Sequence, residues 1–152
     1  MSGLTDLDRL VCEMRPTLKD GLFVFCSLPF AEAERLRHLD TLGTFREEEG
    51  ITLILPVAVA AGEGIACSAP MRLITLSVYS SLEAVGLTAA IATALSREGI
   101  SANVVAAFHH DHVFVPAADG ERALQVLTAL SGSGASGSLP RARDRRFQRS
   151  PQ

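Results

Sequence analysis

Apolar and polar positions alternate in several short segments of this chain, a pattern typical of half-buried β-strands. The clearest segment is 73–78 (LITLSV), in which apolar and hydroxyl residues alternate and several residues are β-branched. Similar runs occupy residues 21–28, 44–47, 51–55, 102–108 and 112–115. Proline follows three of these runs, at positions 29, 56 and 116, and proline cannot donate to a sheet hydrogen-bond ladder. The pattern therefore predicts six strands.

Helical periodicity fills the intervals between these strands. Apolar residues recur every four positions from Leu87 to Leu95, and Gly99 is expected to close that helix in a left-handed C-cap. Ser80 stands three residues before Glu83, the reciprocal hydrogen-bonding signature of a helix start, so this helix is predicted to begin at Ser80. Further helices are expected over 6–14, where Pro16 stops the helix, and over 31–42, 56–64 and 121–130.

The order strand, helix, hairpin occurs twice, which favours an α+β fold with helices on one face of an antiparallel sheet. Segments 45–56 and 108–116 each carry an aromatic residue, a polar turn and an apolar strand that ends at proline. We interpret this as a degenerate internal repeat. Neither unit shows a fourth strand after its second helix. The first strand of one unit would then complete the sheet of the other, which would interlock them.

Three short motifs carry a family resemblance: the glycine-bearing turn 85–87 (VGL), the segment 99–104 (GISANV) and the segment 107–115 (AFHHDHVFV). The second is similar to the entry to the second strand in aspartate kinase ACT domains, and the third to a strand pair of tandem-ACT arginine sensors. The chain thus resembles ACT domains, small βαββαβ modules that bind amino acids and regulate metabolic enzymes. The resemblance implies two ferredoxin-like ACT units with antiparallel sheets covered by helices on one face, predicted over 1–68 and 69–131.

The turn at residues 80–87 is the candidate ligand site. A helix N-terminus presents unpaired N–H groups and a partial positive charge, which suit the α-carboxylate of an amino acid. Glu83 could receive an α-ammonium group, although a purely structural capped turn would have the same sequence. In ACT domains this turn and the facing second strand line the effector site. The resemblance therefore implies a ligand site made of Ser80, Ser81, Leu82, Glu83, Val85, Gly86, Leu87, Asn103, Val104 and Asp111.

Two members of this set have alternative explanations. Asn103 is a polar residue on a strand rich in Val and Ala, and it could simply cap a sheet edge. Asp111 matches the Asp of the arginine-sensor motif, but it also belongs to the cluster His109–His112. Because strand side chains alternate, His110 and His112 share one face while His109 and Asp111 share the other, and no clear third and fourth metal ligand exists. A solvated hairpin turn is favoured over a metal site, and neither a metal nor a cofactor is predicted.

Catalytic and nucleotide-binding motifs lack the required context. Segment 132–137 satisfies GxGxxG, but it follows a helix and sits in no βαβ unit. No serine lies in a nucleophile elbow, and the cysteines at 12, 26 and 67 have neither CxxC spacing nor an activating neighbour. An odd number of cysteines without such spacing is typical of reduced thiols in the cytoplasm.

Composition narrows the remaining function classes. The 152 residues are 47% hydrophobic and carry a net charge of −3, which does not suit phosphate backbones, and a sheet that stacks RNA bases would need more aromatics than a single Tyr and no Trp provide. The longest apolar stretch, 51–61, is too short to cross a bilayer, and no secretory signal opens the chain. Residues 132–152 are rich in Gly, Ser and Arg, so a disordered tail is expected.

These observations predict a cytoplasmic regulatory protein without catalysis of its own. It would bind an amino acid or a similar small metabolite and assemble as a homodimer. A ligand-free module for protein interaction or oligomerisation is the first alternative. A metal-dependent enzyme built on His109–His112 is the second.

Overall fold

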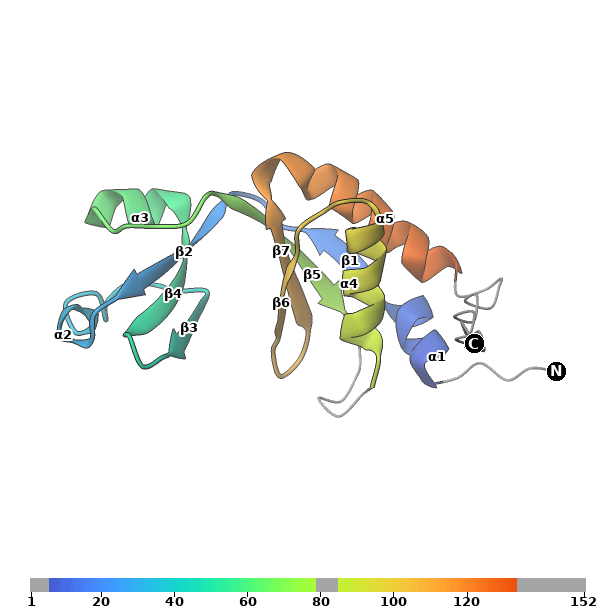
Figure 1. The fold of residues 1–152 in the computed structure, drawn as a ribbon, viewed down its shortest axis with the longest axis horizontal. Coiled ribbons are helices and arrows are strands. Elements are labelled where there is room, and N and C mark those ends of the chain that lie inside the picture. The colour runs from blue at the N-terminus through green and yellow to red at the C-terminus, as the bar shows by residue number, and fades with distance from the viewer. Residues whose placement is uncertain (1–5, 79–84, 134–152) are drawn as a thin grey trace, which may run out of the picture.

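A seven-stranded antiparallel sheet runs through the computed structural model, which describes residues 6–78 and 85–133 (Figure 1). Its strands are β1 (Arg15–Leu18), β2 (Phe23–Leu28), β3 (Gly43–Arg46), β4 (Ile51–Pro56), β5 (Met71–Ser77), β6 (Asn103–Ala106) and β7 (Asp111–Pro116). The helices are α1 (Asp6–Glu13), α2 (Phe30–Ala33), α3 (Val57–Glu63), α4 (Leu87–Arg97) and α5 (Gly120–Ser133), with a 3-10 turn, Ala117–Asp119, before α5. The predicted α+β class, with helices packed on an antiparallel sheet, is confirmed.

β1 is a strand that the hydrophobic pattern does not predict, because Pro16 is interpreted there as a helix stop. Among the strands in the described part of the chain, β1 pairs only with β5, with Pro16 opposite Leu76. Proline is tolerated at such an edge because its missing N–H is not needed by a second neighbour.

One edge of β5 holds two different strands. β1 pairs with residues 74–77 of β5, whereas β2 meets β5 only where Phe23 lies opposite Met71. Between them the chain turns away at Gly21, which has a φ of +84°. The strand order is β3-β4-β2-β5-β7-β6, and β1 pairs with β5 outside this order. Because β1 comes from the first half of the chain and completes the sheet of the second half, the two halves interlock. The predicted boundary at residue 68 stays a prediction, because strand pairing crosses it.

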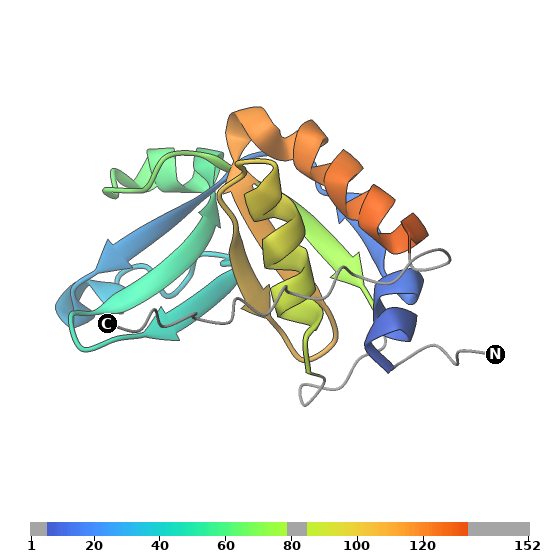
Figure 2. The same cartoon turned by 45° about the vertical axis from the view of Figure 1, so that its right-hand side comes forward.

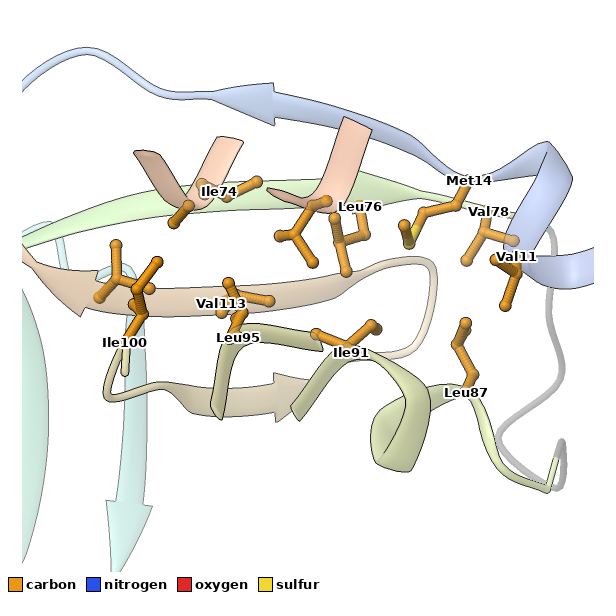
Figure 3. Close-up of a cluster of buried hydrophobic side chains, with 13 residues drawn as sticks. Val11, Met14, Ile74, Leu76, Val78, Leu87, Ile91, Leu95, Ile100 and Val113 are labelled. Carbon is orange, nitrogen blue, oxygen red and sulfur yellow. The ribbon is translucent and has the colours of Figure 1, made fainter. Parts of the chain in front are cut away.

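Three helices cover one face of the sheet around β5 and β7 (Figures 1 and 2). α4 contributes Leu87, Ile91 and Leu95 to this core, and α1 contributes Val11 (Figure 3). These side chains pack against alternate residues of β5 and β7 and against α5. The other buried members of this cluster are Met14, Ile74, Leu76, Val78, Ile100, Val113, Val115, Ala123 and Leu127. This is the larger of the helix-side cores.

A second helix-side core lies under α3 and the segment that follows α2. It combines alternate residues of β2 and β4 with Leu36 and Ala60, and its buried members are Val24, Cys26, Leu28, Leu36, Leu53, Leu55 and Ala60. On the opposite face of the sheet, Phe114 of β7 contacts Phe23 and Phe25 of β2 edge to face, with ring centroids 6.3 and 5.0 Å apart. This aromatic cluster joins the two halves where their strand pairing is shortest.

The predicted helix over 31–42 is wrong beyond residue 33. The chain continues in tight turns closed by i→i+3 bonds, such as the Leu36 N–H donating to the Ala33 carbonyl at 3.2 Å and the Leu39 N–H donating to the Leu36 carbonyl at 3.0 Å. Four of the nine residues 34–42 are charged and only Leu36 is fully buried, so no continuous apolar stripe holds a longer helix against the sheet.

The start of α4 and the end of α5 also differ from the sequence pattern. α4 begins at Leu87, since Gly86 occupies its N-cap with a φ of +99°, and the predicted cap at Ser80 and Glu83 lies outside the described residues. α5 continues to Ser133, so the first two residues of the predicted tail are helical, and the rest of that tail lies outside the described residues. No helix in the described ranges has both the length and the apolar character to cross a bilayer.

The aromatic cluster yields a direct test of how the two halves are joined. Phe114 is 1% exposed, so Phe114→Ala should lower the free energy of unfolding by about 3–5 kcal/mol, the usual cost of emptying a buried aromatic site. Urea unfolding followed by circular dichroism measures the loss. Phe108→Ala is the matched control, because Phe108 is 79% exposed and its removal should change stability by less than about 0.5 kcal/mol. Equal effects of the two substitutions would contradict the role assigned to Phe114.

Candidate ligand-binding sites

The start of α4 is closely packed against α1. A Cβ atom on Gly86 would lie 3.0 Å from Cδ2 of Leu7, and the left-handed backbone at this position favours glycine as well. Leu87 is buried in the core, whereas Val85 is 86% exposed. Of the predicted ligand residues at this turn, Gly86 and Leu87 thus have structural roles, and Val85 faces solvent. Residues 80–83 lie outside the described residues.

The other predicted ligand residues are divided between the two faces of the sheet. Val104 lies opposite Val113 and belongs to the helix-side core, so Asn103, its neighbour in the strand, points to the opposite face. Asp111 pairs with Leu76 and shares the helix side with Val113. Asp111 and the start of α4 therefore lie on one side, while Asn103 lies on the other. A single pocket that contains all the predicted residues is not formed by the described residues, and the set stays a prediction.

Asp111 is the one acidic side chain buried in the described part of the chain. Burial raises the pKa of its carboxyl group, and the neighbouring His112 and His110 oppose that rise. Burial also lowers the pKa of His112, whose Nδ1 lies 3.1 Å from Oγ1 of Thr75. His110 has a buried Nδ1 that finds no hydrogen-bond partner among the described residues. Within the ranges 6–78 and 85–133, no three His, Cys, Asp or Glu residues are arranged to hold a metal ion.

A cavity lies in the first half of the chain, between the turns after α2 and the strands β3 and β4. Its volume is about 390 Å³. Apolar side chains from the helix-side core line part of its wall, and polar or charged side chains complete it. The lining residues are Phe30, Ala33, Glu34, Leu36, Arg37, Leu39, Thr41, Thr44, Arg46, Ile51 and Leu53.

Charged groups gather at this cavity. The guanidinium carbon of Arg46 lies 4.6 Å from the centroid of the Phe30 ring, a cation–π arrangement that holds the cation in place. No carboxylate among the described residues lies within ion-pair distance of Arg46. Glu34 pairs with Arg37 at 2.9 Å, but both side chains are more than three-quarters exposed, so the pair contributes little and can exchange partners. The cavity therefore offers a cation, Arg46, for a carboxylate and an anion, Glu34, for an ammonium group.

Sequence reasoning does not find this cavity. A helix over 31–42 would cover the face of β3 and β4, whereas the short α2 leaves it open. The lining residues also follow no recognisable spacing, because they come from a helix, a turn and two strands. The internal repeat is the only sequence signal here, since it assigns β3 the place that β6 has in the second half.

Comparison with known proteins identifies the family. One ACT-domain model matches residues 2–72, and a second ACT-domain model matches residues 68–129. The chain belongs to the ACT-domain family. The predicted family is thereby confirmed, with two ACT domains in tandem. No curated protein sequence matches this ACT protein.

Solved structures show the same architecture. A Vibrio cholerae protein of unknown function, named as a possible transport protein, is 46% identical, with a TM-score of 0.75 over 86% of this chain and 99% of that one. The regulatory subunit of aspartate kinase from Thermus flavus is 11% identical, with a TM-score of 0.53 over 78% of this chain and 96% of that one. Aspartate kinase from Clostridium acetobutylicum is 12% identical, with a TM-score of 0.56 over 77% of this chain and 34% of that enzyme. The two kinase structures share the fold with this ACT protein.

The buried carboxyl group yields a prediction about pH. Its pKa is raised above the ordinary value of 3.8, so ionised Asp111 costs stability above the folded pKa, and this cost vanishes below 3.8, where both states are protonated. Asp111→Asn should therefore raise the free energy of unfolding at neutral pH, and the gain should shrink as the pH falls toward about 4. Urea titrations over this pH range measure it.

Asp40→Asn is the control, because Asp40 is exposed and its amide should change stability little at any of these pH values. If Asp111→Asn instead lowers the free energy of unfolding at neutral pH, the charged carboxylate stabilises the folded state, and the raised pKa assigned to Asp111 is wrong.

Proposed function

We propose that this ACT protein is a regulatory protein that binds an amino acid or a similarly small metabolite and has no catalysis of its own. The observation that carries the proposal is the tandem ACT architecture, since ACT modules bind amino acids and regulate metabolic enzymes. The chemistry of the cavity in the first ACT domain supports it. We also propose that the protein works in the cytoplasm and controls a partner or its own assembly.

The cavity in the first domain suits an α-amino acid. Its volume of about 390 Å³ lies within the range of roughly 300–1,000 Å³ that small-molecule sites usually have. Arg46 can donate two parallel hydrogen bonds to a carboxylate, because the geometry of a planar guanidinium matches that of a carboxylate. Glu34 can receive the ammonium group, and Leu36, Leu39 and Leu53 provide an apolar wall for a side chain.

The second domain supplies the other proposed site, built from residues 80–87 with Asn103, Val104 and Asp111. Val85 and Asn103 are both exposed but lie on different sides of the sheet, so one ligand could contact both only where Val85 comes from one protomer and Asn103 from the other. In this arrangement the site would be completed by dimerisation.

A thermal-shift screen against the twenty amino acids tests binding. Ligand at a hundred times its dissociation constant adds about 2.7 kcal/mol, so a specific amino acid should raise the melting temperature by several degrees. Two variants separate the sites: Arg46→Gln removes the cation of the cavity, and Asn103→Ala removes the polar group of the second site. Arg97→Gln is the control for Arg46→Gln, because it removes an equally exposed arginine at the end of α4.

Each outcome of the screen assigns or removes a site. A shift lost only in Arg46→Gln places the ligand in the first domain, and a shift lost only in Asn103→Ala places it in the second. If no amino acid changes the melting temperature of the folded wild-type protein, amino-acid binding is refuted. Gly86 is not a suitable position for this test, because any side chain there strains the backbone and meets Leu7.

A ligand-free interaction module is the second candidate, and the free edges of the sheet favour it. β3 and β6 are the end strands, and Phe45 on β3 and Phe108 just beyond β6 are 71% and 79% exposed. Exposed strand edges with apolar side chains invite pairing with another chain. An oligomer whose size stays the same with every amino acid, as measured by light scattering, would favour this function over ligand sensing.

A further inference from the structure

Cys26 and Cys67 face each other across two adjacent chain segments. Cys26 belongs to β2, and Cys67 lies in the segment 64–70 that connects α3 with β5. The two residues form an isolated antiparallel bridge. Next to it, the Ser68 N–H donates to the Phe25 carbonyl at 2.9 Å, and the Phe25 N–H donates to the Ser68 hydroxyl at 3.0 Å. The cysteine pair lies immediately next to these two hydrogen bonds between Phe25 and Ser68.

This position brings the two side chains close together. Residues opposite each other at a non-hydrogen-bonded antiparallel position have Cα atoms about 4.5 Å apart, within the range of about 4.4–6.8 Å that disulfides span. The two Sγ atoms are 2.7 Å apart, only about 0.7 Å more than the covalent length of about 2.05 Å. No backbone rearrangement is needed to join them.

We propose that Cys26 and Cys67 are a redox modification site, which forms an intramolecular disulfide when a low-molecular-weight disulfide such as oxidised glutathione is the oxidant. The two thiols differ in access: Cys67 is exposed, whereas Cys26 is 2% exposed. The third cysteine, Cys12, is half-buried and lies in α1, far from both in the fold. Of the three cysteines, Cys26 and Cys67 are thus the two that are close enough to form an intramolecular disulfide.

Exposure sets the order of the two exchange steps. The thiolate of Cys67 attacks one sulfur of the oxidant, which forms a mixed disulfide and releases one small thiol. Cys26 then loses its proton and attacks Sγ of Cys67, which forms the protein disulfide and releases the second small thiol. Two protein thiols are oxidised, and one oxidant disulfide is reduced to two thiols. Burial, with a smaller contribution from the contact with Cys67, raises the pKa of Cys26 to about 12, so Cys26 reacts second.

The bond would fix the connection between the two ACT domains. Segment 64–70 leads directly into β5, whose first residue, Met71, makes the one pairing between β2 and β5. A disulfide at Cys67 would hold this segment on β2 by a covalent link, in addition to the hydrogen bonds of Ser68. Oxidation would therefore stiffen the junction on which the relative placement of the two domains depends.

Peptide mapping of the full-length protein tests the proposal. The protein is incubated with oxidised glutathione, free thiols are alkylated, and the digest is analysed by mass spectrometry without reduction. We expect a peptide that links Cys26 to Cys67, a free Cys12, and a melting temperature about 5–10 °C higher that returns to its starting value with dithiothreitol. Cys12→Ser should behave like the wild type, and Cys67→Ser should abolish the linked peptide and the shift.

Three outcomes would overturn the proposal: both cysteines remain alkylatable, glutathione stays attached to Cys67, or Cys67 links two chains. The map of the wild-type protein decides among them even if a cysteine variant does not fold. None of these results depends on amino-acid binding.

Discussion

The edge of β5 that receives both β1 and β2 is the constraint on which the rest of the structure depends. The first half of the chain runs along this edge, gives one strand to the second domain, and then turns at Gly21 into its own sheet. Only one residue pair joins β2 to β5 directly. The aromatic contacts of Phe114 with Phe23 and Phe25 therefore provide much of the apolar contact that keeps the two domains in one continuous sheet.

The sharing of strands makes the two ACT domains unequal. The second domain has α1, α4 and α5 on its sheet, because the N-terminal helix packs there together with β1. The first domain is left with α3 and the short α2, so part of the face of β3 and β4 stays uncovered. α1 and β1 complete the core of the second domain, whereas the cavity in the first domain lies where α2 ends after Ala33. A ligand site in the first domain would be a direct result of this asymmetry.

The sequence predicts elements with strong periodicity well and elements with mixed signals poorly. The strands β2 to β7 are found because β-branched residues alternate and prolines mark their ends, and α4 and α5 are found from their apolar spacing. β1 is missed because Pro16 has the same appearance in a helix stop and in an edge strand, and only the pairing with β5 distinguishes the two. The helix after Pro29 is overestimated because a few apolar residues suggest a stripe that the charged residues between them interrupt.

The candidate site is harder to predict than the fold, since it depends on contacts between distant segments. The family resemblance selects Asn103 and Asp111 from local motifs, but alternation along β6 and β7 sends their side chains to opposite faces. The cavity around Arg46 lies where the helix predicted over 31–42 ends early, after Ala33, and no sequence motif indicates that early end. The proximity of Cys26 and Cys67, 41 positions apart in sequence, follows from the path of the connecting segment and has no local signature.

The position of β1 also has a consequence for the order of events in folding. β1 pairs with residues 56 to 62 positions further along the chain, so it is synthesised well before its partner strand. Closing such a long loop costs conformational entropy before any stabilising contact forms, so pairing of this kind slows folding. During synthesis β1 remains unpaired, and the apolar face of α1 remains uncovered, until β5 has been made. The segment that completes the second domain in the finished protein is therefore exposed to solvent while the chain is still incomplete.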